Sequence, residues 1–236
     1  MKYYLSTIFG AATLALVQPH VTLAQTVIQP DVQTIASQFT VKVNPDGEWG
    51  SGAIVGRNGN VYYVLTARHV INDIRSGEEL WLVTHDRKDH KVNIDAISFL
   101  PNNIDLALIQ FTSKNDYPVA TISSYDYRLY ERRDYENSAV SNVNEDKQYL
   151  YVSGFPLVGD KRVFNPGFLF DNSASSIASP DIANPDDYFG GYELIYTNLT
   201  HPGMSGGGVV DTAGRLVGIH GRGDGSVIGE EDEIIR

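Results

Sequence analysis

The chain has 236 residues, of which 42% are hydrophobic and 20% charged, and it contains no cysteine. This composition is typical of a globular protein, and without cysteine it excludes a disulfide framework, a zinc–thiolate site and a cysteine nucleophile. The formal net charge of −11 would repel phosphate backbones and anionic lipid, which disfavours nucleic acid as the main partner.

The N-terminal segment is predicted to be an export signal. Lys2 is the only charged residue before an uncharged run over residues 5–17, and Thr22-Leu23-Ala24 ends in small residues where a signal peptidase would cut. The run is too short to span a bilayer, so we expect residues 1–24 to be removed and to leave no membrane anchor. A buried N-terminal helix is the alternative. The export signal predicts a secreted or periplasmic protein.

The remaining chain shows the rhythm of short strands after a single helix. We expect Asp31 to cap a helix over residues 32–38. Asn58-Gly59 separates two apolar runs and tolerates positive φ at both positions, so residues 49–66 are predicted to form a hairpin. No helical stretch exceeds about ten residues, which favours an all-β barrel or sandwich. The expected strands are residues 39–43, 49–56, 61–66, 80–84, 91–99, 106–111, 149–153, 163–170, 194–198, 207–211 and 215–221.

A polar segment divides the chain into two parts of similar size. Residues 123–147 are poor in aliphatic side chains and dense in Tyr, Asp, Glu, Arg and Asn. We expect residues 123–148 to connect an N-terminal barrel of residues 25–122 with a C-terminal barrel of residues 149–236. A solvated insertion within one domain is the alternative.

Three separate residues carry chemistry. His69 directly follows an apolar strand, where a histidine is most often structural. Asp105 opens an apolar run and, because aspartate is costly to bury unpaired, it is expected to cap a turn or to hold a specific partner. Ser205 is surrounded by glycines, which allow positive φ and close approach to backbone N–H groups, although a plain glycine-rich turn has the same pattern.

Together these residues favour acyl transfer by an activated serine. In the order His, Asp and Ser they provide a general base, a group that orients it and a nucleophile. Residues 203–207 also fit the nucleophile elbow of α/β-hydrolases, but that fold needs its histidine well after the serine. Only His220 follows, inside the next expected strand, so the elbow interpretation is rejected.

Six segments of the sequence together carry a resemblance to a known protein family. They are residues 50–55, 65–70, 105–109, 152–156, 203–207 and 216–221. On these segments the chain resembles the chymotrypsin-like, or trypsin-like, serine peptidases, within the bacterial branch that includes HtrA-type and glutamyl endopeptidases. The resemblance implies an all-β fold of two six-stranded antiparallel Greek-key β-barrels with few short helices. It places His69 and Asp105 in the first barrel, Ser205 in the second, and the active site in the cleft between them.

The resemblance also implies a mechanism. His69 takes the proton of Ser205 during attack on a peptide carbonyl, Asp105 fixes the ring tautomer, and an acyl-enzyme forms. The backbone N–H groups of Gly203 and Ser205 form the oxyanion hole. No metal or organic cofactor is needed. In trypsin-like zymogens an aspartate precedes the nucleophile and captures a new N-terminal amine; here Met204 stands there, so we expect activity without an internal propeptide cut.

The resemblance suggests a preference for glutamate before the cut. Thr200, five residues before the nucleophile, and His220 occupy the places that bind an acidic side chain in glutamyl endopeptidases. Leu199 provides no anion to select Lys or Arg, whereas His201 could line the same pocket. Gly221-Arg222-Gly223 would pair with an extended protein or peptide substrate by β-augmentation. Alternatively, Thr200 satisfies local backbone and His220 is an ordinary strand residue.

Other interpretations remain open. The chain could be a catalytically silent double barrel that binds peptides or partners. Arg222-Gly223-Asp224 matches an adhesion motif by three residues only, and Asn198-Leu199-Thr200 fits a glycan acceptor pattern inside the expected pocket. After Gly223 one short apolar run and an acidic end remain, so the second barrel either closes economically or is truncated.

Overall fold

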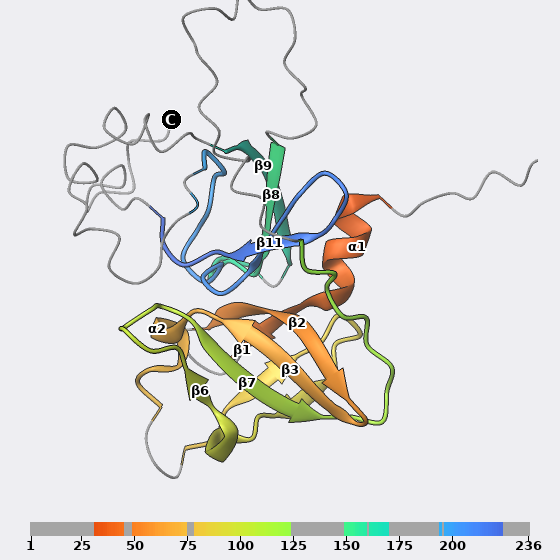
Figure 1. Cartoon of the computed structure of the whole chain (residues 1–236), viewed down its shortest axis with the longest axis vertical. Coiled ribbons are helices and arrows are strands. Elements are labelled where there is room, and N and C mark those ends of the chain that lie inside the picture. Colours follow the sequence, from red (N-terminus) through yellow and green to blue (C-terminus); the bar gives the residue numbers. More distant parts are fainter. Residues whose placement is uncertain are drawn as a thin grey trace, which may run out of the picture.

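The computed structural model describes residues 31–44, 49–74, 78–123, 149–159, 161–169, 194 and 196–223. The expected export signal, nearly all of the expected connector and the C-terminal residues 224–236 lie outside these ranges. The described residues form two β-sheets and a few short helices, as the sequence predicts (Figure 1). Within this part of the chain, no helix has both the length and the apolar character required to cross a membrane.

Helix α1 (Val32–Phe39) begins where the sequence predicts it. The carboxylate of Asp31 accepts a hydrogen bond of 2.7 Å from the N–H of Thr34, which satisfies a free donor of the first turn. Phe39 was expected to open the next strand but is the last residue of the helix, because the N–H of Thr40 still bonds to Ala36 O. Strand β1 (Thr40–Val43) follows at once.

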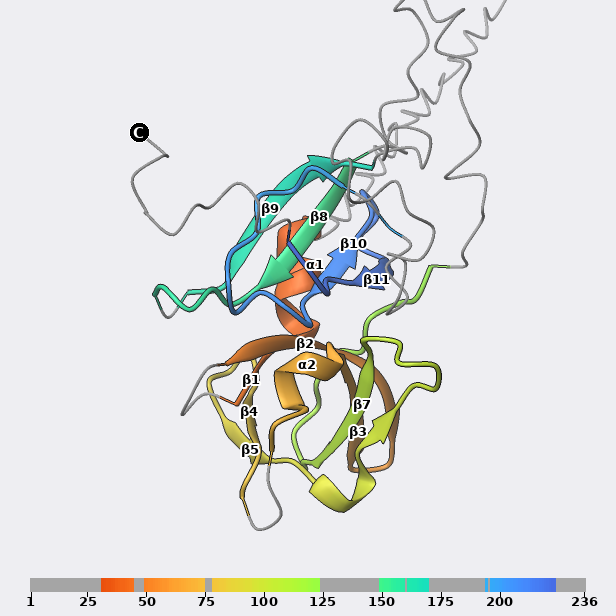
Figure 2. The ribbon, with the colours of Figure 1, turned by 90° about the vertical axis from the view of Figure 1, so that its left-hand side faces the viewer.

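The N-terminal sheet has seven strands in the order β5-β4-β1-β2-β3-β7-β6. The other strands are β2 (Gly50–Asn58), β3 (Val61–Thr66), β4 (Trp81–Val83), β5 (Asp89–Lys91), β6 (Ser98–Phe99) and β7 (Ala107–Thr112). A bridge between Val92, which follows β5, and Phe111 of β7 closes six of these strands into a barrel (Figure 2). The first half of the chain is therefore a barrel with the expected number of strands.

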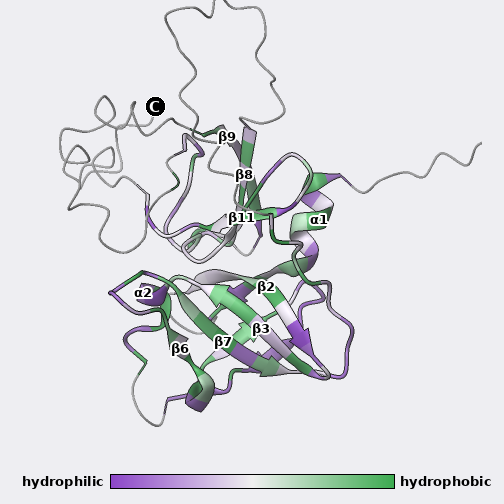
Figure 3. Ribbon diagram, viewed as in Figure 1, coloured by the Kyte–Doolittle hydropathy of each residue, from purple (hydrophilic) through white to green (hydrophobic). Residues whose placement is uncertain are grey.

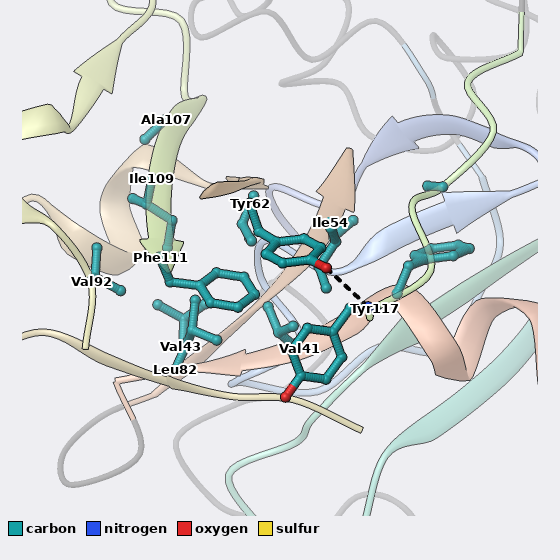
Figure 4. Packing of buried hydrophobic residues seen from close by; sticks show 14 of the residues in the cluster. Val41, Val43, Ile54, Tyr62, Leu82, Val92, Ala107, Ile109, Phe111 and Tyr117 are labelled. Carbon is teal, nitrogen blue, oxygen red and sulfur yellow. Dashed lines mark hydrogen bonds between the residues drawn. The ribbon is translucent and has the colours of Figure 1, made fainter. Parts of the chain in front are cut away.

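The largest buried cluster of the described residues fills this barrel and extends to α1 and the C-terminal sheet; Figure 4 shows part of it. Alternate residues of β3 are buried, which is the pattern of a strand with one face toward a core. The rings of Tyr62 and Phe111 stack with their centroids 5.1 Å apart. Figure 3 shows that hydrophobic residues predominate along β3 and β7, whereas the short helix α2 (Arg68–Ile71) is polar where it faces outward.

Two predicted elements differ in detail. The β2–β3 hairpin forms, but its two loop residues are Gly59 and Asn60, and only Gly59 has positive φ, at +59°. The expected strand over residues 91–99 is broken by the 3-10 helix η1 (Ile94–Ala96). Ile94 and Ile97 both pack against the core, and a spacing of three residues suits a 3-10 turn better than a strand.

The C-terminal sheet has four strands among the described residues, in the order β11-β10-β8-β9. They are β8 (Tyr149–Gly154), β9 (Val163–Phe168), β10 (Gly208–Val210) and β11 (Leu216–Ile219). Among the described residues of the expected strand over 194–198, one bridge joins Tyr196 to Leu169, and the Thr197 N–H donates to Phe168 O at 3.0 Å. The side chain of Asn198 then binds the carbonyls of Leu150 and Asn165.

The two sheets meet across a tightly packed seam. Val210 and Leu216 of the C-terminal sheet belong to the same buried cluster as Phe39 and Ala53. The hydroxyls of Thr40 and Ser153 lie 2.7 Å apart across the seam, and both residues are fully buried. Because buried residues from both sheets pack together here, backbone segments on the two sides of the seam can hold one another at fixed positions.

Helix α1 precedes the N-terminal barrel in sequence but lies against the C-terminal sheet (Figures 1 and 2). The guanidinium of Arg162, before β9, donates hydrogen bonds to Gln33 O at 3.3 Å and to the Ser153 hydroxyl at 2.9 Å. On the same helix, the Ile35 side chain covers Gly214, where an added Cβ would lie 2.9 Å from Ile35 Cγ2. The helix thus bridges the two halves.

Candidate active site

His69 lies in α2, directly after β3, and is held by Asp105. Its ring Nδ1 lies 2.7 Å from Asp105 Oδ2, and its backbone N–H donates to Asp105 Oδ1 at 2.9 Å. The Asp105 side chain is 12% exposed, while that of His69 is half exposed. With Nδ1 donating to the carboxylate, Nε2 of the neutral ring is an acceptor, as a general base requires.

A tight turn places Asp105 beside the histidine. Asn102 and Asn103 have φ of +60° and +56°, in the left-handed region that asparagine tolerates better than most residues. The N–H of Ile104 then bonds to Pro101 O at 3.3 Å, and Asp105 emerges just before β7. The sequence predicted that Asp105 caps a turn or holds a specific partner, and the structure shows that it holds His69.

Ser205 lies in a glycine-rich loop before β10. Gly203 and Gly206 have φ of +93° and +86°. A Cβ at Gly203 would lie 2.6 Å from Phe155 O, and one at Gly206 would overlap Ser51 O, so both positions require glycine. The hydroxyl of Ser205 donates to Gly221 O at 3.3 Å. Among the described residues it forms no hydrogen bond with His69 in this structure.

Two backbone N–H groups in this loop have no acceptor among the residues that the structure describes. Pro202 O accepts a hydrogen bond from Leu157 N–H at 2.7 Å, and Met204 O accepts one from Gly207 N–H at 2.9 Å. In a trans peptide the N–H points away from the C=O, so the N–H groups of Gly203 and Ser205 are turned away from these partners. Neither N–H bonds to any other described group, which suits a site for a negatively charged oxygen.

The seam brings the serine loop against the segment that carries His69. A Cβ on Gly50 would press on the side chain of Val70, next to His69, and would lie 3.0 Å from Ser205 O. On the other side of the loop, Gly206 lies against the hydroxyl of Thr66 and the backbone of Ala67. Gly50 thus lies between Val70 and the backbone of Ser205, and the residues just before α2 lie against Gly206.

Met204 is fully buried beside Ser205. It belongs to the second buried cluster of the described residues, together with Leu150, Val152 and Val209. The sequence showed only that this position lacks an aspartate. The structure adds that the thioether side chain anchors the loop in an apolar core, where an unpaired carboxylate would be costly.

The buried His220 and the partly buried Tyr196 form a pair on the C-terminal side of the site. His220 is 3% exposed, and its Nδ1 lies 2.7 Å from the Tyr196 hydroxyl. Burial, together with the nearby charge of His69, lowers the pKa of His220 to about 4, and burial raises the pKa of Tyr196. Both groups are therefore neutral at pH 7.

The consecutive residues Asn198, Leu199 and Thr200, which the sequence places at the expected pocket, differ in burial and contacts. Thr200 lies next to the chain edge, because a Cβ on Gly223 would be 3.1 Å from its Oγ1. Leu199 is 62% exposed, since Asn165 Nδ2 holds its carbonyl and the side chain points outward. Asn198 is buried with its amide nitrogen bound to two carbonyls, so it cannot accept a glycan in the folded protein.

The expected substrate edge follows His220 directly. Gly221 is buried and Arg222 and Gly223 are exposed, while Asp224 of the adhesion motif lies outside the described residues. The backbone of His220 makes two hydrogen bonds to the serine loop. Its carbonyl accepts from the Gly206 N–H, and its N–H donates to Gly207 O. This edge is thus attached to the loop that carries Ser205.

Ser51 was missed as a candidate residue. It is a fully buried residue of β2, and its hydroxyl donates to Gly203 O at 2.9 Å. The segment Gly50-Ser51-Gly52 stands out in the sequence as a serine between two glycines at the start of a strand, but its long-range partner is not visible there. Within the described ranges, no group of three or more His, Asp or Glu residues is arranged to hold a metal ion.

Comparison with models of protein families matches residues 50–219 to the trypsin-like peptidase domain. The match runs from the first residue of β2 to the last residue of β11 and includes His69, Asp105 and Ser205. It ends one residue before His220. A search of curated proteins found no match.

Proposed function

The chain belongs to the trypsin-like peptidase family, and on this premise we propose that it is a secreted or periplasmic serine endopeptidase that uses a Ser205–His69–Asp105 triad. The family match identifies a peptidase domain, whose substrates are proteins or peptides. The observation that carries the choice of residues is the double hydrogen bond between His69 and Asp105. It holds the ring of His69 on α2, and the residues just before α2, Thr66 and Ala67, lie against Gly206 of the serine loop.

In the proposed reaction, Ser205 Oγ attacks the carbonyl carbon of the scissile peptide bond. Its proton passes to Nε2 of His69, which can accept it because Asp105 holds the opposite ring nitrogen. The tetrahedral intermediate then collapses, the C–N bond breaks, and His69 returns the proton to the leaving amine. Water enters by the same proton relay and hydrolyses the acyl-enzyme.

The negative charge of the intermediate is assigned to the N–H groups of Gly203 and Ser205. Both groups lack a partner among the described residues, and the carbonyls of their peptide units are held by Leu157 and Gly207. Each such donor contributes about 3 kcal/mol to transition-state stabilisation in enzymes of this type. The burial of Met204 supports a loop that is held without an activating ion pair, and therefore activity without an internal cut.

An acidic side chain before the cut is the proposed preference. Thr200 contributes a hydroxyl beside Gly223, and His220 contributes an imidazole. If the Tyr196 hydroxyl donates to His220 Nδ1, the neutral ring carries its proton on Nε2 and can donate it to a carboxylate. The backbone of Gly221-Arg222-Gly223 would pair with the substrate on the same edge.

The export signal over residues 1–24 and the division into barrels at residues 25–122 and 149–236 are part of this proposal. The two sheets support the division, because every strand of one precedes residue 113 and every strand of the other follows residue 148. Secretion is supported by the uncharged run and the small residues before position 25. Determining the N-terminus of the exported protein would test it.

A fluorophosphonate probe separates this proposal from its alternative, a silent double barrel that binds peptides. The probe should label the wild-type protein at Ser205, and the wild-type protein should cleave a peptide library. Ser205→Ala should abolish labelling and cleavage and leave the melting temperature nearly unchanged, because among the described residues the hydroxyl makes one long hydrogen bond, of 3.3 Å, to Gly221 O. A pure wild-type protein that neither labels nor cleaves would favour the silent barrel.

A further inference from the structure

Four consecutive carbonyls around the proposed oxyanion hole are each held by a defined donor. They are Pro202 O, held by Leu157 N–H; Gly203 O, held by the Ser51 hydroxyl; Met204 O, held by Gly207 N–H; and Ser205 O, held by Ser51 N–H. Ser51 therefore supplies two of the four donors. It is also the only one of the three donor residues that lies in the N-terminal sheet.

Ser51 uses all of its hydrogen-bonding groups. The hydroxyl donates to Gly203 O at 2.9 Å and accepts from Phe155 N–H at 2.8 Å. The backbone N–H donates to Ser205 O at 2.7 Å, and the carbonyl accepts from the Thr66 hydroxyl at 2.7 Å. The residue is fully buried, so water cannot replace a lost partner without a rearrangement.

The position of the Gly203 carbonyl determines how the two oxyanion donors face each other. This carbonyl belongs to the peptide unit between Gly203 and Met204, which lies between the two N–H groups in question. Gly203 has φ of +93° and no side chain, so its own backbone preferences restrict the unit little. The Met204 side chain adds an apolar anchor, and the Met204 N–H at the other end of the unit donates to His201 O at 3.0 Å. The Ser51 hydroxyl holds the carbonyl end of the unit, and it does so from the opposite sheet.

We propose that Ser51 is a positioning residue, which holds the oxyanion hole in its active geometry from the opposite sheet. This inference rests on the proposed peptidase function. The Ser51 hydroxyl touches neither the substrate nor the reacting atoms, and it acts through Gly203 O. Its loss should therefore weaken binding of the transition state and leave ground-state binding of the substrate nearly intact.

Ser51→Ala is the test, and Ser153→Ala is the matched control. Ser153 is a fully buried serine of β8 whose hydroxyl also has two partners, in its case the side chains of Thr40 and Arg162, neither of which is in the serine loop. Both variants should lose stability. Ser51→Ala alone should lower kcat roughly 10- to 100-fold with KM changed less than about threefold, as expected for a misplaced donor.

Two further readouts distinguish positioning from general destabilisation. The affinity for a peptide boronate, which forms a tetrahedral adduct on Ser205, should fall by about the same factor as kcat. The midpoint of the pH dependence of kcat should not move, because the His69–Asp105 pair is untouched. If Ser51→Ala does not fold, Ser51→Cys replaces it, since a thiol fills a similar volume but donates only weakly.

The inference is overturned if a folded Ser51→Ala or Ser51→Cys variant has wild-type kcat and boronate affinity, or if Ser153→Ala loses kcat equally. These results would leave the peptidase function standing, because the wild-type protein would still cleave. A wild-type protein that neither cleaves peptides nor labels with fluorophosphonate would instead refute the proposed function, and the inference with it.

Discussion

Asp105 binds His69 through two separate hydrogen bonds, one to the ring and one to the backbone N–H, at 2.7 and 2.9 Å. The second bond ties the carboxylate to the main chain of α2. The ring therefore meets an acceptor whose position is already set when the helix forms. The His69 side chain is half exposed to solvent, on the side from which a substrate would approach.

Asp105→Asn should reduce kcat/KM by about 10⁴-fold, the loss known for the same exchange in the trypsin triad, because an amide would favour the wrong ring tautomer. Asp211→Asn is the control, since Asp211 pairs with Arg215 on the surface and faces no catalytic group. Its kinetics should equal those of the wild-type protein. A loss smaller than tenfold for Asp105→Asn would argue against the triad.

Gly203→Ala should destabilise the protein and abolish cleavage, because the new Cβ meets the backbone of Phe155 and Leu157 at 2.6 and 2.7 Å. Gly159→Ala is the matched control: its φ of +92° is nearly the same, but no atom lies within 4 Å of the added Cβ. Only the conformational cost of about 1–2 kcal/mol should remain there. Urea unfolding and peptide cleavage check both variants, and equal losses would contradict the steric argument.

Met204→Ala should reduce the free energy of unfolding by about 2–5 kcal/mol, because it leaves a cavity among Leu150, Val152 and Val209. Met204→Leu, of similar volume, should cost less than about 1.5 kcal/mol and retain activity. Chemical denaturation gives both values. If Met204→Asp were as stable as the wild-type protein, the apolar anchor proposed for the serine loop would be wrong.

His220 should make stability depend on pH below neutrality. Its pKa is lowered from 6.5 to about 4 in the folded protein, so the unfolded chain binds more protons in this range and stability falls as pH falls. The shift corresponds to about 3 kcal/mol, lost between about pH 6.5 and 4. His220→Gln should remove this part of the pH dependence. Equal slopes for both proteins would show that His220 is not buried in the neutral form.

Thr200→Val keeps the shape of the side chain and removes its hydroxyl. If that hydroxyl binds an acidic side chain, the ratio of kcat/KM for a Glu substrate over its Gln analogue should fall roughly tenfold or more. Thr212→Val, outside the proposed pocket, should leave the ratio unchanged. A library digest of the wild-type protein with cuts mainly after aromatic or basic residues would exclude the acidic preference altogether.

The local features of the fold could be read from the sequence, whereas the long-range contacts could not. Asp31 and the Asn58-Gly59 hairpin act through neighbours in the chain, and both elements formed close to where they were expected. The strand expected over residues 91–99 failed because tertiary packing of Ile94 and Ile97 favours a 3-10 turn. An apolar run has no mark that distinguishes these outcomes.

In the candidate site, too, residues could be predicted where their type and order are informative, whereas long-range contacts could not. His69, Asp105 and Ser205 could be selected because their residue types and order carry chemistry. Ser51 could not, since its role depends on a carbonyl 152 positions away in the chain. The partner of His220, Tyr196, was likewise hidden, because nothing in its sequence neighbourhood distinguishes it from the other tyrosines.

Helix α1 has a consequence for the integrity of the molecule. It is the first element of the described chain, yet it contacts the second half. Arg162 donates a hydrogen bond to its Gln33 carbonyl, and its Ile35 side chain covers Gly214. A proteolytic nick anywhere between β7 and β8 would therefore produce two fragments that each contain part of the other's packing surface. Such fragments should remain associated and complement one another, so the nicked enzyme would migrate as one species until it is denatured.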